Sequence, residues 1–151
     1  MANTQAMCTS FKTEILDGIH ALGTTVIRAG TGADTLKAAL YLTSATVNAA
    51  TTAYSATGEV SGTNYSAGGI TATNANQPAN SGTTAYWTPS ASFTYTNVTL
   101  STAFDAVLIY NSTQSNKAIS VHTFGSQTVT AWTFVLSMPT NDASTGLLRI
   151  A

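Results

Sequence analysis

The densest apolar run in the chain reads FDAVLIY and spans residues 104–110. Seven residues that are nearly all apolar, without a turn residue among them, favour a central strand that is covered on both faces. A polar turn is expected next, at residues 111–116. Two alternating stretches follow at residues 118–124 and 129–136, with a turn expected at residues 125–126. The C-terminal half of the chain is therefore expected to be densely β-structured.

Further strand patterns lie on either side of this half. Residues 36–42 alternate in the manner of a half-buried strand. At residues 92–100 the alternation changes parity at Asn97, which indicates a bulge or a change of register. Additional short strands are expected at residues 26–27, within 51–69, and at 70–74, 86–87 and 147–150. Roughly eight short strands at this spacing predict a mainly β fold, an antiparallel β-sandwich or jelly roll.

One helix is predicted ahead of the strands, at residues 10–22. Apolar side chains recur there at three- and four-residue steps, and Gly23 stands where helices commonly end. Gly18 lies inside the pattern and weakens it. Residues 1–8 are small and polar and are expected to form an N-terminal arm. The chain of 151 residues is expected to be a single β-sandwich domain that carries this arm and helix.

Charged residues are scarce. They make up 7% of the chain, against about 25% in an average soluble domain, whereas Thr alone supplies 29 residues. The net charge is -1 and the basic residues form no run, so neither nucleic acid nor a membrane is an expected partner. The sequence shows no signal-peptide pattern and no apolar stretch of about 18 residues. The single Cys8 excludes an internal disulfide and fits assembly in a reducing cytoplasm.

Residues suited to catalysis are few. His20 lies in the expected helix and His122 on an expected strand surface, and no motif places a serine and an acid beside either of them. Glu59 and Asp105 are the acids of the β-rich stretch, and nothing in the sequence indicates that they meet as a glycosidase pair. The potential metal ligands, Cys8 included, show no ligand spacing, and no nucleotide-binding motif occurs. We therefore expect no catalytic residue, no metal and no cofactor, and a protein that is not an enzyme.

Aromatic residues offer a different possibility. Tyr86, Trp87, Tyr95 and Trp132 would make a platform for sugar rings if they shared one exposed face, as in a carbohydrate-binding adhesin domain. The alternatives are that Trp132 belongs to the core, or that these rings fill an interface with a neighbouring subunit, where Tyr and Trp are enriched.

Residues 53–69, AYSATGEVSGTNYSAGG, resemble a recurring pattern in small virion proteins of tailed bacteriophages. The likeness extends to ALY at residues 39–41, WTP at 87–89, IYN at 109–111 and FG at 124–125, and it covers most of the chain. It implies a structural viral protein located in the virion and assembled in the host bacterial cytoplasm. It carries no catalytic residues.

The role implied most directly is that of a capsid decoration protein, also called a cement protein. Such a protein bridges subunits of the major capsid protein, stabilises the head and is commonly a homotrimer. The resemblance leaves open a tail, neck or fibre component, which would differ in copy number.

Two segments are expected to supply the assembly interface. The arm has few core candidates, and residues 74–84 read as a long loop that contains Pro78 and Gly82. The residues expected to contact neighbouring subunits are Ala2, Asn3, Thr4, Gln5, Ala6, Met7, Gln77, Pro78 and Trp87.

Overall fold

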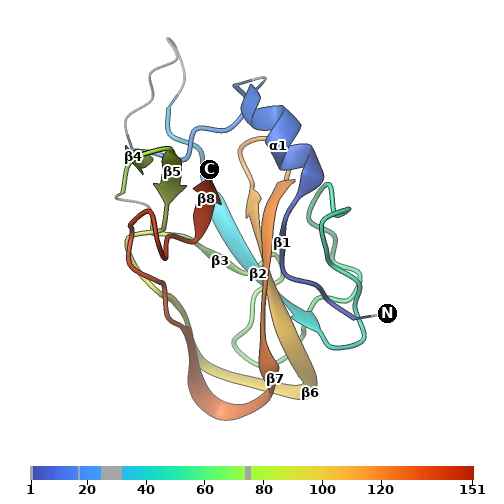
Figure 1. Cartoon of the computed structure of the whole chain (residues 1–151). Coiled ribbons are helices and arrows are strands. Elements are labelled where there is room, and N and C mark those ends of the chain that lie inside the picture. The colour runs from blue at the N-terminus through green and yellow to red at the C-terminus, as the bar shows by residue number, and fades with distance from the viewer. Residues whose placement is uncertain (1, 17, 25–31, 74–75) are drawn as a thin grey trace.

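The computed structural model describes residues 2–16, 18–24, 32–73 and 76–151 (Figure 1). The strand expected at residues 26–27 lies outside this part of the chain. Within it the protein is mainly β, with one short helix, α1 (Thr9–Leu16). The strands form two antiparallel sheets, as the sequence predicts for a β-sandwich.

The larger sheet has five strands, in the order β1 (Ala6–Met7), β7 (Lys117–Leu136), β6 (Phe93–Asn111), β2 (Leu36–Leu42) and β3 (Ile70–Thr71). The smaller sheet has three, in the order β4 (Ala79–Ser81), β5 (Thr84–Trp87) and β8 (Leu148–Ile150). In Figure 1, β6 and β7 run the length of the molecule and curl at their far ends, while α1 and the small sheet lie near the turn that joins them.

Strands β6 and β7 replace four shorter strands that the sequence predicts. The turn expected at residues 125–126 is wrong, because β7 continues through it. The register between the two strands shifts at several points, and Asn97 and Ala131 adopt φ angles of 49° and 48°. The parity change expected at Asn97 is thus confirmed as an irregularity inside a strand. Bulges absorb an extra residue without ending a strand, which is why a broken alternation here bends the hairpin instead of dividing it.

Strand β2 lies deeper than its alternation suggests. Ala38, Ala39, Leu40 and Tyr41 are all buried, so both faces of the strand are covered and the expectation of a half-buried strand is wrong. The strand lies between β6 and β3, and residues 51–69 pass over it with bridges instead of a regular strand.

Tyrosine hydroxyls fasten this irregular segment to the sheet. The hydroxyl of Tyr41 donates to the carbonyl oxygen of Ser55 at 2.5 Å, and that of Tyr110 to the carbonyl oxygen of Gly68 at 2.7 Å. Gly69 has a φ of 70°, and a Cβ there would lie 1.7 Å from a carbonyl oxygen of β2. Only glycine fits such a close approach in the left-handed region.

The helix is shorter than the apolar pattern predicts. It ends at Leu16, and Gly18 has a φ of 67°. The N–H of Gly18 donates to the carbonyl oxygen of Ile15, and the N–H of Ile19 donates to that of Glu14. This pair of bonds is the Schellman arrangement, with glycine at the C′ position. Gly18, and not Gly23, therefore ends the helix, and His20 lies in the loop that follows.

Residues 76–84, the described part of the loop expected at 74–84, do not form one long loop. Strand β4 pairs with β5 around a two-residue turn, where Gly82 has a φ of 57°. All three residues of β4 are exposed, so their polar sequence gives no alternation from which a strand could be predicted.

Candidate functional site

The N-terminal segment is attached to the body of the protein instead of extending as an arm. Asn3 Nδ2 donates to the carbonyl oxygen of Leu42 at 3.0 Å and to Asp105 Oδ1 at 2.6 Å. Its Oδ1 accepts a hydrogen bond from the N–H of Val47 at 3.0 Å, and the N–H of Thr4 donates to the carbonyl oxygen of Val47. The expectation of a free arm at residues 1–8 is corrected by these contacts.

The rest of this segment forms the edge of the large sheet. Ala6 and Met7 pair with Val121 and Ser120 of β7. Cys8 follows in a fully buried position, and burial, together with the nearby Glu14 carboxylate, raises the pKa of its thiol to about 11.

Trp87 is a core residue. Its side chain is 2% exposed, and its indole Nε1 donates to the carbonyl oxygen of Asn76 at 3.2 Å. The ring is packed inside the protein and also lines a cleft, and its contact with another subunit stays a prediction. Gln77 is hydrogen-bonded to the Thr24 hydroxyl, and Pro78 lies beside Trp87.

Clefts beside strand β8 are lined by residues of both expected interface segments. A cleft of about 670 Å³ lies between β8 and the N-terminal edge and is lined by Gln5, Ala6 and Met7. A second cleft, of about 260 Å³, lies between α1 and the small sheet and is lined by Pro78 and Trp87. A third, of about 410 Å³, is lined by Met7 and the end of β8. The small sheet is thus bordered by clefts where it meets α1 and β1.

The four aromatic residues do not form the platform that a sugar-binding surface needs. Trp87 and Tyr95 are each 2% exposed, whereas Trp132 is 74% exposed. Of the alternatives left open by the sequence, a core position for Trp132 and an exposed surface shared by all four rings are both contradicted.

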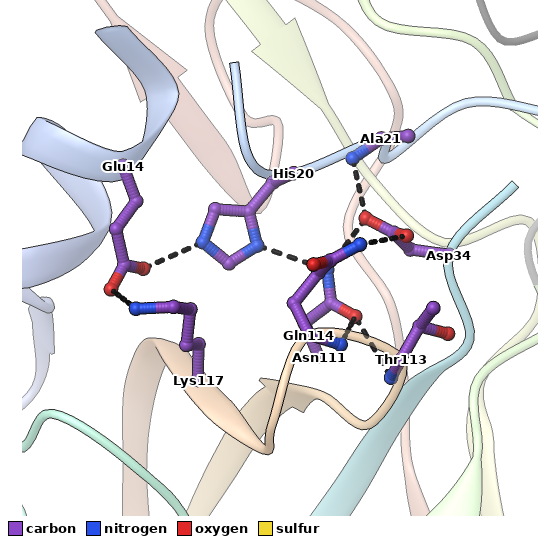
Figure 2. A network of polar contacts seen from close by, with 8 residues as sticks. All are labelled: Glu14, His20, Ala21, Asp34, Asn111, Thr113, Gln114 and Lys117. Carbon is purple, nitrogen blue, oxygen red and sulfur yellow. Dashed lines mark hydrogen bonds and ion pairs between the residues drawn. The ribbon is translucent and has the colours of Figure 1, made fainter. Parts of the chain in front are cut away.

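A buried polar network joins α1, the segment ahead of β2 and the β6–β7 turn (Figure 2). Asn111 is fully buried at the end of β6, and its Oδ1 accepts hydrogen bonds from the N–H groups of Thr113 and Gln114. Its Nδ2 therefore faces Asp34 Oδ2 at 2.7 Å and His20 Nδ1 at 3.0 Å. Asp34 also accepts hydrogen bonds from the N–H of Ala21 and from Gln114 Nε2.

The orientation of Asn111 determines the tautomer of His20. An amide nitrogen only donates, so His20 Nδ1 accepts and the ring proton resides on Nε2. That nitrogen lies 2.7 Å from Glu14 Oε2, and Glu14 Oε1 lies 2.6 Å from Lys117 Nζ. Burial disfavours the charged carboxylate of Glu14, but the hydrogen bonds from Lys117 and His20 outweigh it and lower the pKa of Glu14. Both ring nitrogens of His20 are occupied, and its side chain is 1% exposed, so the network is suited to holding three segments together.

The sequence did not reveal this network, because the partners are distant in the chain. Asn111 is separated from Asp34 by 77 positions and from His20 by 91. The available signal was a polar residue directly after the most apolar run of the protein.

His122 and Ser120 form a second polar pair, in the 670 Å³ cleft. The Ser120 hydroxyl lies 2.9 Å from His122 Nε2, and burial lowers the pKa of His122 to about 4. Ser120 is fully buried, and no carboxylate among the described residues is hydrogen-bonded to His122. The pair therefore lacks the acid that orients a catalytic histidine.

Glu59 and Asp105 belong to separate hydrogen-bond groups. Glu59 accepts hydrogen bonds from the hydroxyls of Tyr54 and Tyr65 and from the N–H of Gly68, while Asp105 is bonded to Asn3. Burial and the bond to Glu59 raise the pKa of both tyrosines.

The described ranges contain no group of three or more Cys, His, Asp or Glu side chains that could hold a metal ion. Among the same residues, no helix has the length and apolar character that crossing a bilayer requires. Neither a protein-family model, nor a curated protein, nor a solved structure matches the chain.

Proposed function

We propose that the chain is a structural protein of a tailed-bacteriophage virion, most specifically a capsid decoration protein that bridges major capsid subunits and stabilises the head as a homotrimer. The proposal rests on the resemblance in the sequence, and one structural observation supports a non-catalytic role. In the described part of the chain, every carboxylate side chain accepts a hydrogen bond from the protein itself.

These carboxylates hold segments in place. Glu14 accepts a hydrogen bond from Lys117 and Asp34 one from Gln114, donors that are 103 and 80 positions away in the chain. Glu59 accepts from the hydroxyl of Tyr65, Asp105 accepts from Asn3, and Asp142 accepts from an N–H of its own turn. A general acid or base must reach a substrate, and a metal ligand must have a free lone pair directed at the ion. Carboxylates committed to the fold support a protein that works through contact.

The surface around β8 is the contact area that we assign to the shell. It combines clefts lined by both segments that the sequence indicates as interface, and Ile150 on β8 is 48% exposed. A small contact of this kind binds weakly, but several contacts made by one oligomer act together because the second is formed at a high effective concentration.

Copy number in the intact particle tests the proposal. Quantitative mass spectrometry of purified virions should find this chain at a number on the order of hundreds, as a symmetric shell requires. A cryo-EM map should place it on the outer surface of the head. A count in the tens or fewer would instead indicate a tail, neck or fibre component, and absence from purified virions would refute a virion role.

A carbohydrate-binding adhesin is the less supported function. Its aromatic platform is not present, because only Trp132 of the two tryptophans is exposed.

A further inference from the structure

The cleft of about 670 Å³ lies between two strand edges, and each edge has main-chain groups directed away from its own sheet. On β1, the N–H of Cys8 donates to the carbonyl oxygen of Ile119, in the same register as the pairs of Ala6 and Met7 with β7. Hydrogen-bonded and non-hydrogen-bonded pairs alternate along an antiparallel ladder. Cys8 and Ala6 therefore face β7, whereas the N–H and C=O of Met7 point away from it.

The same reasoning applies to β8. Ser81 and Thr84 flank a two-residue turn and therefore form a hydrogen-bonded pair. Hydrogen-bonded pairs recur at every second position, so Tyr86 also forms one with Ala79, and the N–H and C=O of Tyr86 face β4. Tyr86 is opposite Arg149 in the pairing of β5 with β8. The N–H and C=O of Arg149 consequently point away from β5, toward the open side of the small sheet.

Met7 and Arg149 line the same two clefts, those of about 670 and 410 Å³. Two strand edges thus border one space, and among the described residues neither edge is paired with a further strand. A strand edge is satisfied by another strand, and addition of an extended peptide to such an edge is a common mode of recognition.

The charge in the larger cleft favours one kind of strand. Arg149 is the one ionised side chain among its described lining residues, because His122 is neutral above a pH of about 4. The guanidinium donates one hydrogen bond, to the carbonyl oxygen of Ser144, and forms no ion pair within 4 Å among the described residues. An arginine side chain carries five N–H donors, so the guanidinium of Arg149 can also donate hydrogen bonds to the carboxylate of a partner.

We propose that this cleft is a vacant strand position between β1 and β8, which accepts an extended segment of a partner polypeptide with an acidic side chain beside Arg149. The inserted strand would pair with Met7 on one side and Arg149 on the other and would join the two sheets. This mode of binding does not depend on the virion role, since any partner chain with such a segment would fit.

Proline at position 7 tests the main-chain part of the proposal. Met7→Pro removes an outward N–H and should leave the β1–β7 bonds intact, because proline is tolerated on the outer side of an edge strand. Met7→Ala controls for loss of the side chain. Thr71→Pro is the matched control, because Thr71 lies on β3, at the opposite edge of the same sheet. The N–H of Ala72 donates to the carbonyl oxygen of Leu36, so the N–H and C=O of the neighbouring Thr71 point outward from that edge.

The probe is a fluorescein-labelled peptide of alternating threonine and valine with one central aspartate, titrated by fluorescence anisotropy. Saturable binding should weaken about tenfold or more in Met7→Pro and change little in Met7→Ala and Thr71→Pro. Equal binding by Met7→Pro and the parent protein, or no saturable binding by the parent protein at millimolar concentration, would overturn the proposal.

The acidic side chain is tested separately, and this test stands if Met7→Pro does not fold. Arg149→Gln should weaken binding of the aspartate peptide several-fold and leave binding of the matching asparagine peptide unchanged. Equal effects on the two peptides would contradict the role of Arg149.

Discussion

Acidification should destabilise the protein through the side chain of His122. Burial lowers the pKa of this histidine from 6.5 to about 4. The unfolded chain therefore binds a proton at a higher pH than the folded chain does. For a group whose pKa is lower in the folded state, stability rises with pH wherever only the unfolded state is protonated. The contribution of neutral His122 to the free energy of unfolding is therefore complete above about pH 6.5 and is lost as the pH falls toward 4.

The magnitude follows from the difference between the two pKa values. The shift of 2.5, which is 6.5 minus 4, corresponds to about 3 kcal/mol once the pH is below both values. At pH 5 the loss is about 2 kcal/mol, which lowers the melting temperature of a chain of this length by about 4–8 °C. Glu14, whose pKa is lowered from 4.5, loses its contribution only at more acidic pH.

Urea unfolding between pH 7.5 and 4.5, followed by circular dichroism, measures this loss. The comparison is with His122→Gln, which keeps a polar group near the Ser120 hydroxyl and does not titrate. The variant should show a much flatter dependence above pH 4.5, with the same slope of free energy against urea. Parallel curves for the two proteins would refute the assignment of the acid sensitivity to His122.

Three further predictions concern stability. Asn111→Leu should lower the free energy of unfolding by about 3 kcal/mol or more, because it leaves buried polar partners without a donor. A loss below about 1 kcal/mol in thermal unfolding would contradict the stabilising role of the network. Gly69→Ala should lower the free energy of unfolding by well over the roughly 1 kcal/mol expected for Gly82→Ala. Both glycines have positive φ, but only at Gly69 would a Cβ meet main-chain atoms. Similar urea midpoints for the two variants would argue against this close approach. Trp87→Ala should lower the free energy of unfolding by about 3–5 kcal/mol, and Trp132→Ala by less than about 0.5 kcal/mol. The reverse order in unfolding experiments would overturn the assignment of Trp87 to the core and of Trp132 to the surface.

Strand positions were predictable where the signal is local. The apolar run at residues 104–110 lies in β6 between two neighbouring strands, and residues 36–42 match β2. The end of α1 was also encoded locally, by Gly18. It was missed because the apolar pattern continues to Leu22, and a repeat does not reveal whether one glycine adopts a positive φ.

The burial of the tryptophans could not be predicted from the sequence. Which face of a sheet a side chain occupies depends on the pairing register of its strand, and every bulge that precedes the residue changes that register. Irregularities at Asn97 and Ala131 shift which side chains share a face. One residue of slip transfers a side chain from the core to solvent. Trp132 follows one of these irregularities and is exposed, whereas Trp87 precedes them on a different sheet and is buried.

Scarcity of charge and the internal use of carboxylates have a common physical consequence. In the described part of the chain, the acids fasten segments of low regularity, such as residues 51–69 around Glu59 and the N-terminal segment around Asp105. The exposed surface is then left mainly to hydroxyls, small side chains and main-chain edges. Hydroxyls do not repel one another as like charges do, and their desolvation costs less than that of charged groups, so such a surface can approach another protein more closely than a charged one. Specific binding must then come from shape and from main-chain hydrogen bonds, which is the recognition that the cleft between β1 and β8 is built to provide.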